Sequence, residues 1–252
     1  MTAKPKQVSR LKFALHLWVA GMLGMVAVTV TLLRELLEGI VLPIPLWAIS
    51  IISLGQSAVF VALSVWAGVS LAPRVGLQAP ILSAWITRVS IAPVFRTPVI
   101  NGLLGGLLGG VFLFGAWRYA PGVLADAQER LNLPLFARVL YGGITEELLL
   151  RWGLMTVLVW LAWRFVQRRQ GAPATAYVLL AIFLSAMLFG AGHLPTAIQL
   201  VGPLNASEVA WVLGVNTTFG LLFGYLFWRS GLESAMIAHA LTHVVDYLGN
   251  LL

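Results

Sequence analysis

The feature that most constrains the fold of this chain is a series of long apolar runs that contain almost no charge. A helix needs about 20 apolar residues to cross the hydrocarbon core of a bilayer. Seven runs approach or exceed this length, and they cover residues 11–33, 46–71, 99–117, 139–163, 174–193, 209–228 and 232–250. The sequence therefore predicts an all-α, polytopic integral membrane helical bundle with about seven transmembrane helices.

The composition excludes most other classes of protein. Hydrophobic residues make up 60% of the chain and charged residues 10%, whereas soluble domains have about 45–50% and about 25%. The net charge is +7, but no basic stripe interleaved with aromatic residues accompanies it, so we expect no nucleic-acid partner. The chain has no cysteine, which excludes disulfides and thiolate metal sites. The expected surroundings are a lipid bilayer.

Two shorter segments are expected to lie at the membrane surface. Residues 79–98 combine Pro, Arg and Trp and indicate an interfacial segment, and residues 122–138 indicate an amphipathic helix that leads into the fourth span. The uncharged run 13–33 is too long for the apolar core of a signal peptide, so we expect it to be retained as the first span. Because the loops are short, residues 1–252 are expected to form a single membrane domain.

The basic residues of the predicted loops divide unequally between the two sides of the membrane. Eleven fall on the side of the N-terminus, namely Lys4, Lys6, Arg10, Lys12, Arg74, Arg88, Arg96, Arg164, Arg168, Arg169 and Arg229. Four fall on the other side, namely Arg34, Arg118, Arg130 and Arg138. Positive charge favours the cytoplasmic side. We therefore expect a multi-pass protein of the cell (cytoplasmic or inner) membrane, with a cytoplasmic N-terminus and an external C-terminus.

A glycine repeat predicts close packing of the third span. Gly102, Gly106 and Gly110 are four residues apart, so they share one face of a helix. Small residues at this spacing let another helix backbone approach closely. The preferred interpretation is a packing surface, and a functional hinge is the alternative.

An acidic pair and an arginine lie inside the fourth predicted span. Ionisable residues in a membrane cost on the order of 3 kcal/mol, so they are candidates for function. On a helix, Glu147 and Arg151 are four residues apart and can form an ion pair. Glu146 points about 100° away from Glu147 if the helix is α-helical. A carboxylate that is free of the arginine suits a general base.

Three histidines lie in the last spans. His193 follows Gly190 and Gly192 near the end of the fifth span, where the small residues indicate a tight backbone approach around its ring. His239 and His243 share a helix face at the spacing of two metal ligands. Asp246 is expected to orient the ring of His243. The depths of these residues and of Glu146 are compatible, which predicts that they converge on one polar cavity.

The ordered set of motifs resembles the CAAX protease and bacteriocin-processing family, also called the CPBP or abortive-infection family. The motifs are Glu-Glu-x-x-x-Arg at 146–151, Phe-x-x-x-His at 189–193 and His-x-x-x-His at 239–243. The resemblance covers residues 135–250. It implies an intramembrane endopeptidase that hydrolyses a peptide bond in a peptide or membrane-protein substrate.

The resemblance also implies a role for each motif residue. Glu146 and His193 would activate water, Glu147 and Arg151 would complete the first motif, and His239 with the residue four later would bind the oxyanion. That later position is usually Asn in the family and is His243 here.

A metal site is the other interpretation of the same residues. His193, His239 and His243 with Glu146 would make a ligand set for a divalent metal such as zinc. The two interpretations stay open at the level of the sequence.

Two other classes of function compete with the peptidase. A non-catalytic scaffold, chaperone or immunity protein could keep the same fold, and the histidine at position 243 points mildly in that direction. A proton- or ion-coupled transporter could use the same buried acids, but it predicts internal repeats, and the sequence contains no convincing halves.

Overall fold

The computed structural model describes residues 9–130 and 133–251, and every regular element within them is helical. In chain order these are α1 (Arg10–Thr31), α2 (Leu33–Leu36), α3 (Leu46–Leu71), η1 (Ala72–Val75), α4 (Pro80–Thr87), α5 (Ala92–Trp117), α6 (Gly122–Arg130), α7 (Leu135–Leu140), η2 (Tyr141–Glu146), η3 (Leu148–Met155), α8 (Thr156–Leu161), η4 (Ala162–Val166), α9 (Thr175–Val201), α10 (Ala206–Ser230) and α11 (Leu232–Gly249). The all-α fold class is confirmed. Lys4 and Lys6 lie outside the described residues, as do the side chains of Glu129 and Arg130.

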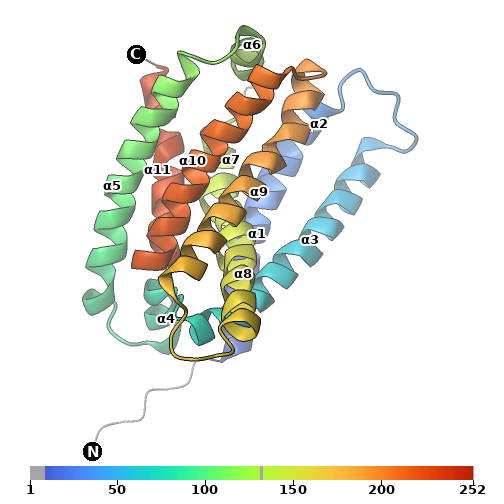
Figure 1. The fold of residues 1–252 in the computed structure, drawn as a ribbon. Coiled ribbons are helices and arrows are strands. Elements are labelled where there is room, and N and C mark those ends of the chain that lie inside the picture. The colour runs from blue at the N-terminus through green and yellow to red at the C-terminus, as the bar shows by residue number, and fades with distance from the viewer. Residues whose placement is uncertain (1–8, 131–132, 252) are drawn as a thin grey trace, which may run out of the picture.

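Within the part of the chain that the structure describes, six helical segments are long and apolar enough to cross a membrane. They are Arg10–Thr31, Leu46–Val75, Ala92–Trp117, Leu135–Val166, Thr175–Val201 and Ala206–Ser230. The seventh predicted span forms a helix, α11, but this helix has 18 residues and carries Glu233, two histidines and Asp246. These polar residues explain why α11 lies outside the set of six, although Figure 1 shows it running alongside α5 and α10.

Several predicted boundaries differ from the observed ones. The segment 79–98 is not one surface element, because α4 ends at Thr87 and the membrane helix α5 begins at Ala92. The segment 122–138 is likewise divided between α6 and the start of α7. Helix α9 continues to Val201 although Pro195 lies inside it, so His193 lies two turns before the end of its helix rather than near it.

The long helices run up and down through one bundle and leave the loops at its two ends (Figure 1). The end at which α1 begins also holds α4 and the connections from η4 to α9 and from α10 to α11. The opposite end holds α2, α6 and the connection from α9 to α10. The count of basic residues on the two sides of the membrane requires this same division of the loops. Arg74, Arg88, Arg168 and Arg169 therefore lie at the α4 end.

The predicted glycine face of α5 packs directly on α11. A Cβ atom added at Gly102, Gly106 or Gly110 would lie 2.8, 2.6 or 2.4 Å from the Cβ atom of Ile237, Leu241 or Val245, respectively. These distances are shorter than any real contact between two carbon atoms, so only glycine permits this approach. The packing interpretation of the repeat is thereby supported, and it fixes the helix that carries His239 and His243 against α5.

Candidate active site

The acidic pair lies in a helix whose backbone is partly π-helical. The segment from Leu135 to Val166 is one continuous helical span, and its central parts η2 and η3 adopt the wider π-helical form. The prediction of an α-helix at the two glutamates is therefore wrong. π-Helical turns are rare and often occur at functional sites. Because the bonds run from residue i to i+5, Tyr141 and Glu146 face the same side of the helix.

This π-helical stretch is held against the first span. The Thr145 hydroxyl donates a hydrogen bond of 2.7 Å to the carbonyl of Gly21, and its side chain is fully buried. A Cβ at Gly24 would lie 2.5 Å from the Leu140 carbonyl oxygen. Gly24 of α1 therefore admits the backbone where α7 ends and η2 begins, and Thr145 holds η2 directly beside the two glutamates.

The inner carboxylate, Glu147, forms the predicted ion pair. Its Oε1 lies 3.2 Å from Nη1 of Arg151, and both side chains are almost fully buried. Arg151 also donates from Nη2 to the Gly220 carbonyl at 3.4 Å. Its guanidinium lies over the rings of Phe189 and Phe223, at 4.7 and 5.5 Å from their centroids. The arginine thus links η3 to α9 and α10.

Glu147 also has a partner that the sequence did not predict. Its Oε1 lies 2.8 Å from Nδ1 of His239 on α11. An ionised carboxylate can only accept, so Nδ1 donates, and a neutral His239 then has its lone pair on Nε2. The ring of His239 also stacks on Phe223, with 4.5 Å between centroids and 22° between planes. His239 is therefore fixed in both orientation and tautomer.

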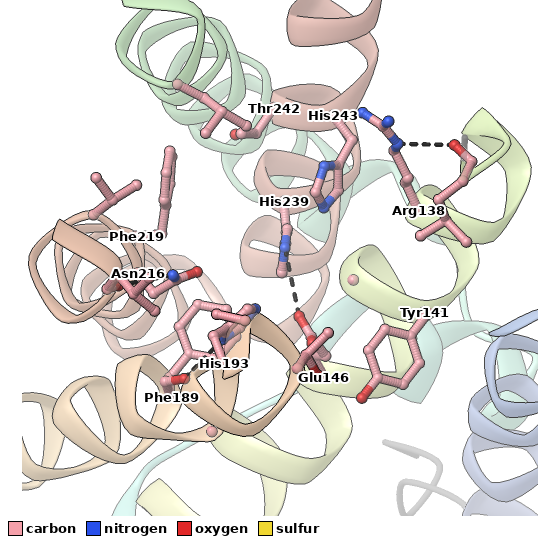
Figure 2. A pocket seen from close by; sticks show the side chains of 18 of the residues that line it. Arg138, Tyr141, Glu146, Phe189, His193, Asn216, Phe219, His239, Thr242 and His243 are labelled. Carbon is pink, nitrogen blue, oxygen red and sulfur yellow. Dashed lines mark hydrogen bonds and ion pairs between the residues drawn. The ribbon is translucent and has the colours of Figure 1, made fainter. Parts of the chain in front are cut away.

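The outer carboxylate, Glu146, faces the free nitrogen of the same histidine. Its Oε2 lies 3.8 Å from Nε2 of His239. The two carboxylates of the pair thus contact opposite sides of one imidazole ring. The distance is too long for a direct hydrogen bond, but a water molecule beside both atoms can contact each at about 2.8 Å. Figure 2 shows Glu146 and His239 opposed in this way.

These groups line one cavity of about 550 Å³, as the sequence analysis predicted. Its polar wall includes Glu146, His193, His239 and His243, which come from three separate segments of the chain (Figure 2). Much of the remaining wall is apolar, with residues such as Leu32, Leu113, Leu150, Leu188 and Leu200. Arg151 and Glu147 do not line the cavity and lie behind it.

His193 is oriented by its own helix. Its Nδ1 lies 2.9 Å from the carbonyl oxygen of Phe189, which can only accept, so Nδ1 carries a proton. A neutral His193 therefore has an acceptor at Nε2. The neighbouring glycines have a different role from the predicted one, because Gly190 packs on Thr217 and Leu213 of α10, and a Cβ at Gly192 would meet nothing within 4 Å.

His243 stacks on His239, with ring centroids 5.0 Å apart. Within the described residues no hydrogen bond restrains its ring, so its tautomer is free and Nε2 can donate. The predicted contact between Asp246 and His243 is wrong. Asp246 is instead 3.6 Å from Nη1 of Arg138, which also donates from Nε to the Leu133 carbonyl at 2.9 Å.

The arrangement does not fit the metal site that the sequence left open. Among residues 9–130 and 133–251, no group of three or more His, Asp or Glu side chains is arranged to hold a metal ion. We therefore derive no chemical step through a metal.

Other wall residues escaped the sequence analysis. Tyr141, Gly142 and Asn216 all line the cavity. Asn216 was missed because a single amide in an apolar run gives no pattern. Tyr141 could have been found only from the i to i+5 spacing to Glu146, which applies in a π-helix but not in an α-helix. Gly142 is four residues before Glu146, a spacing that shares one face of an ordinary helix, but a glycine in a Gly-Gly pair gives no signal of a role in a site.

Comparison with known proteins finds one family model that is similar to the segment containing the site. Residues 128–245 match the family model described as Type II CAAX prenyl endopeptidase Rce1-like. The matched segment contains all six candidate residues, from Glu146 to His243. No curated protein and no solved structure matches the chain.

Proposed function

We propose that this chain, in which residues 128–245 form a domain of the Rce1-like type II CAAX prenyl endopeptidase family, is an intramembrane endopeptidase. The observation that carries the proposal is the opposition of Glu146 and Nε2 of His239 across 3.8 Å in the wall of a cavity inside the helical bundle. Peptide hydrolysis needs an activated water, a proton carrier and donors for the oxyanion. A carboxylate and three imidazoles can supply all three.

In the proposed first step, Glu146 is the general base. It takes one proton from a water molecule, while Nε2 of His193 accepts a hydrogen bond from the second hydrogen and orients the water. The water oxygen forms a bond to the carbonyl carbon of the substrate, and the carbonyl π electrons move onto its oxygen. The product of this step is a tetrahedral oxyanion.

In the second step, the proton moves to the leaving nitrogen. Nε2 of His239 accepts it from Glu146 through a water molecule that bridges their 3.8 Å separation, and Glu147 stabilises the imidazolium through the 2.8 Å bond to Nδ1. The imidazolium and Nε2–H of His243 donate hydrogen bonds to the oxyanion. His239 then gives its proton to the nitrogen as the carbon–nitrogen bond breaks, which leaves one carboxyl and one amino terminus.

The substrate is proposed to be a peptide or membrane-protein segment that enters from the bilayer. The apolar part of the cavity wall favours apolar side chains on both sides of the cleaved bond. Charged segments would lose hydration on entry without gaining partners, so they are disfavoured.

Cleavage of a membrane-anchored reporter library by purified, reconstituted protein tests the proposal. We expect Glu146→Gln to keep the fold and expression, because it keeps the size of the side chain and cannot accept a proton. Cleavage should fall by about 10²–10⁴-fold, the usual contribution of a general base.

A scaffold, chaperone or immunity protein of the same fold makes the opposite prediction. Its biological phenotype should survive Glu146→Gln, because no proton transfer is involved. A well-folded Glu146→Gln protein with the full phenotype would therefore overturn the peptidase.

A further inference from the structure

Gly142 lies in η2, in the cavity wall beneath the two histidines of α11. A Cβ atom added there would lie 2.7 Å from Nε2 of His243 and 2.9 Å from Nε2 of His239. Two imidazole nitrogens from one helix thus approach a single point above the backbone of another helix. No other residue type leaves room for both at this distance, because every other residue has a Cβ.

We infer that Gly142 is a positioning residue that allows Nε2 of His239 and Nε2 of His243 to converge on one oxygen atom of the substrate. The inference rests on the proposed peptidase function and assigns this convergence to the oxyanion of the scissile carbonyl. Because both nitrogens lie within 3 Å of the position that a Cβ of Gly142 would occupy, they are less than 6 Å apart, so one oxygen on their cavity side can lie within hydrogen-bonding distance of both. The oxyanion approaches from the cavity side, opposite the glycine.

The structure also indicates which part would move if this glycine were replaced. The atoms nearest the added Cβ are the far ends of two side chains and not backbone. The rings should therefore yield before the helices separate. A shift of His239 would lengthen its hydrogen bond to Glu147 and weaken its stacking on Phe223. The expected result is a folded protein with a displaced imidazole pair.

The neighbouring glycine differs in this respect. A Cβ at Gly143 would lie 2.8 Å from the Cβ of Ala240 and 3.2 Å from its backbone nitrogen. Replacement of Gly143 would therefore displace α11 as a whole, and it would test the packing of η2 on α11 and not the position of the imidazoles. Gly214 on α10 offers the matched control, because its Cβ would meet nothing within 4 Å. Both Gly142→Ala and Gly214→Ala gain the same helix propensity.

The first arm of the experiment measures thermal unfolding and reporter cleavage in proteoliposomes. We expect Gly142→Ala to unfold close to the wild-type temperature and to lose cleavage by about 10²-fold or more, the usual effect of losing an oxyanion donor. Gly214→Ala should keep wild-type cleavage. Equal cleavage by the two variants would overturn the inference, and so would a failure of Gly142→Ala alone to fold.

A double variant separates positioning from general damage. His243→Asn removes the atom nearest the added Cβ and keeps a donor at this position. The fold-loss of cleavage caused by Gly142→Ala should therefore be at least ten times smaller in the His243→Asn background than in the wild-type background. The same loss in both backgrounds would contradict the proposed convergence.

The second arm does not depend on cleavage, so it separates failure of this inference from failure of the proposed function. The chain has four histidines, so ¹⁵N-labelled imidazoles give few resonances. Methylphosphonate serves as the tetrahedral oxyanion probe. We expect it to shift the Nε2 resonances of His239 and His243 in the wild type but not in Gly142→Ala. If the wild-type protein shows no cleavage, the shifts of the imidazole resonances alone test the inference about Gly142. Equal shifts in both proteins, or none in the wild type, would overturn the inference.

Discussion

Oε1 of Glu147 lies 2.8 Å from Nδ1 of His239, a residue 92 positions later in the chain. The same oxygen is 3.2 Å from Nη1 of Arg151. One buried carboxylate atom therefore joins the first motif to the last, and the guanidinium of Arg151 joins both to Phe189 in the middle motif. The three sequence motifs are thus parts of one network of contacts.

This network makes Arg151 a structural residue. Arg151→Ala removes the partner of a fully buried carboxylate and is expected to destabilise the protein by about 3–5 kcal/mol. Thermal unfolding in detergent and the yield of folded protein measure the effect. Arg151→Lys keeps the charge but not the planar group between two rings, so it should lower the stability of the protein less than Arg151→Ala does. Wild-type stability of the alanine variant would argue against the ion pair.

The ring of Phe223 should contribute to turnover more than to substrate binding. It stacks on His239 at 4.5 Å and lies against Arg151, but it does not line the cavity. Phe223→Leu should lower kcat about tenfold or more with little change in KM, because the imidazole is less firmly oriented. Phe95→Leu, at a half-exposed position on α5, is the control and should change neither. An effect on KM alone would contradict this role.

Metal removal should leave cleavage unchanged. The prediction rests on the described residues, among which no group of three or more His, Asp or Glu side chains is arranged to hold a metal ion. Elemental analysis of purified protein and cleavage with and without a chelator are the measurements. A stoichiometric metal that disappears in the His239→Ala, His243→Ala double variant would show that these histidines bind it.

The orientation in the membrane follows from the distribution of arginines between the ends of the bundle. The end of the bundle with α4, Arg74 and Arg168 is expected to face the cytoplasm, and the end of α11 to face the other side. A reporter fused after Leu252 should be active only outside the cytoplasm. A second reporter inserted after Gln170 should give the reverse pattern. Cytoplasmic activity of the C-terminal fusion would contradict the charge rule for this chain.

The sequence was sufficient for features that depend on spacing along a helix. The apolar runs, the contact of Glu147 with Arg151 and the glycine face of α5 all follow from periodicity, and the structure contains each of them. The convergence of Glu146 with the histidines followed from their depth in the spans. These inferences needed no knowledge of which helices are neighbours.

Features that depend on backbone form or on contacts between helices were missed. The π-helical form of η2 has no signal in a run such as Tyr141–Glu146. The closeness of Gly142 to the two histidines depends on the packing of η2 on α11, which the sequence does not show. The partner of Asp246 was wrong because Arg138 comes from another helix, α7. The continuation of α9 past Pro195 shows that a membrane helix can tolerate a lost hydrogen bond where propensity predicts an end.

The packing of α5 on α11 has a mechanical consequence. A contact made by Gly102, Gly106 and Gly110 against Cβ atoms has no long side chain that could compress or change rotamer. Sliding or rotation of α11 would therefore collide with backbone at once, so this wall of the cavity is stiff. Helix α9, which supplies another part of the cavity wall, is joined to α2 by a hydrogen bond of 3.1 Å from Gln199 to the Leu36 carbonyl. The imidazoles of His239 and His243 are therefore carried by a helix whose position along and around its own axis is fixed by backbone contact.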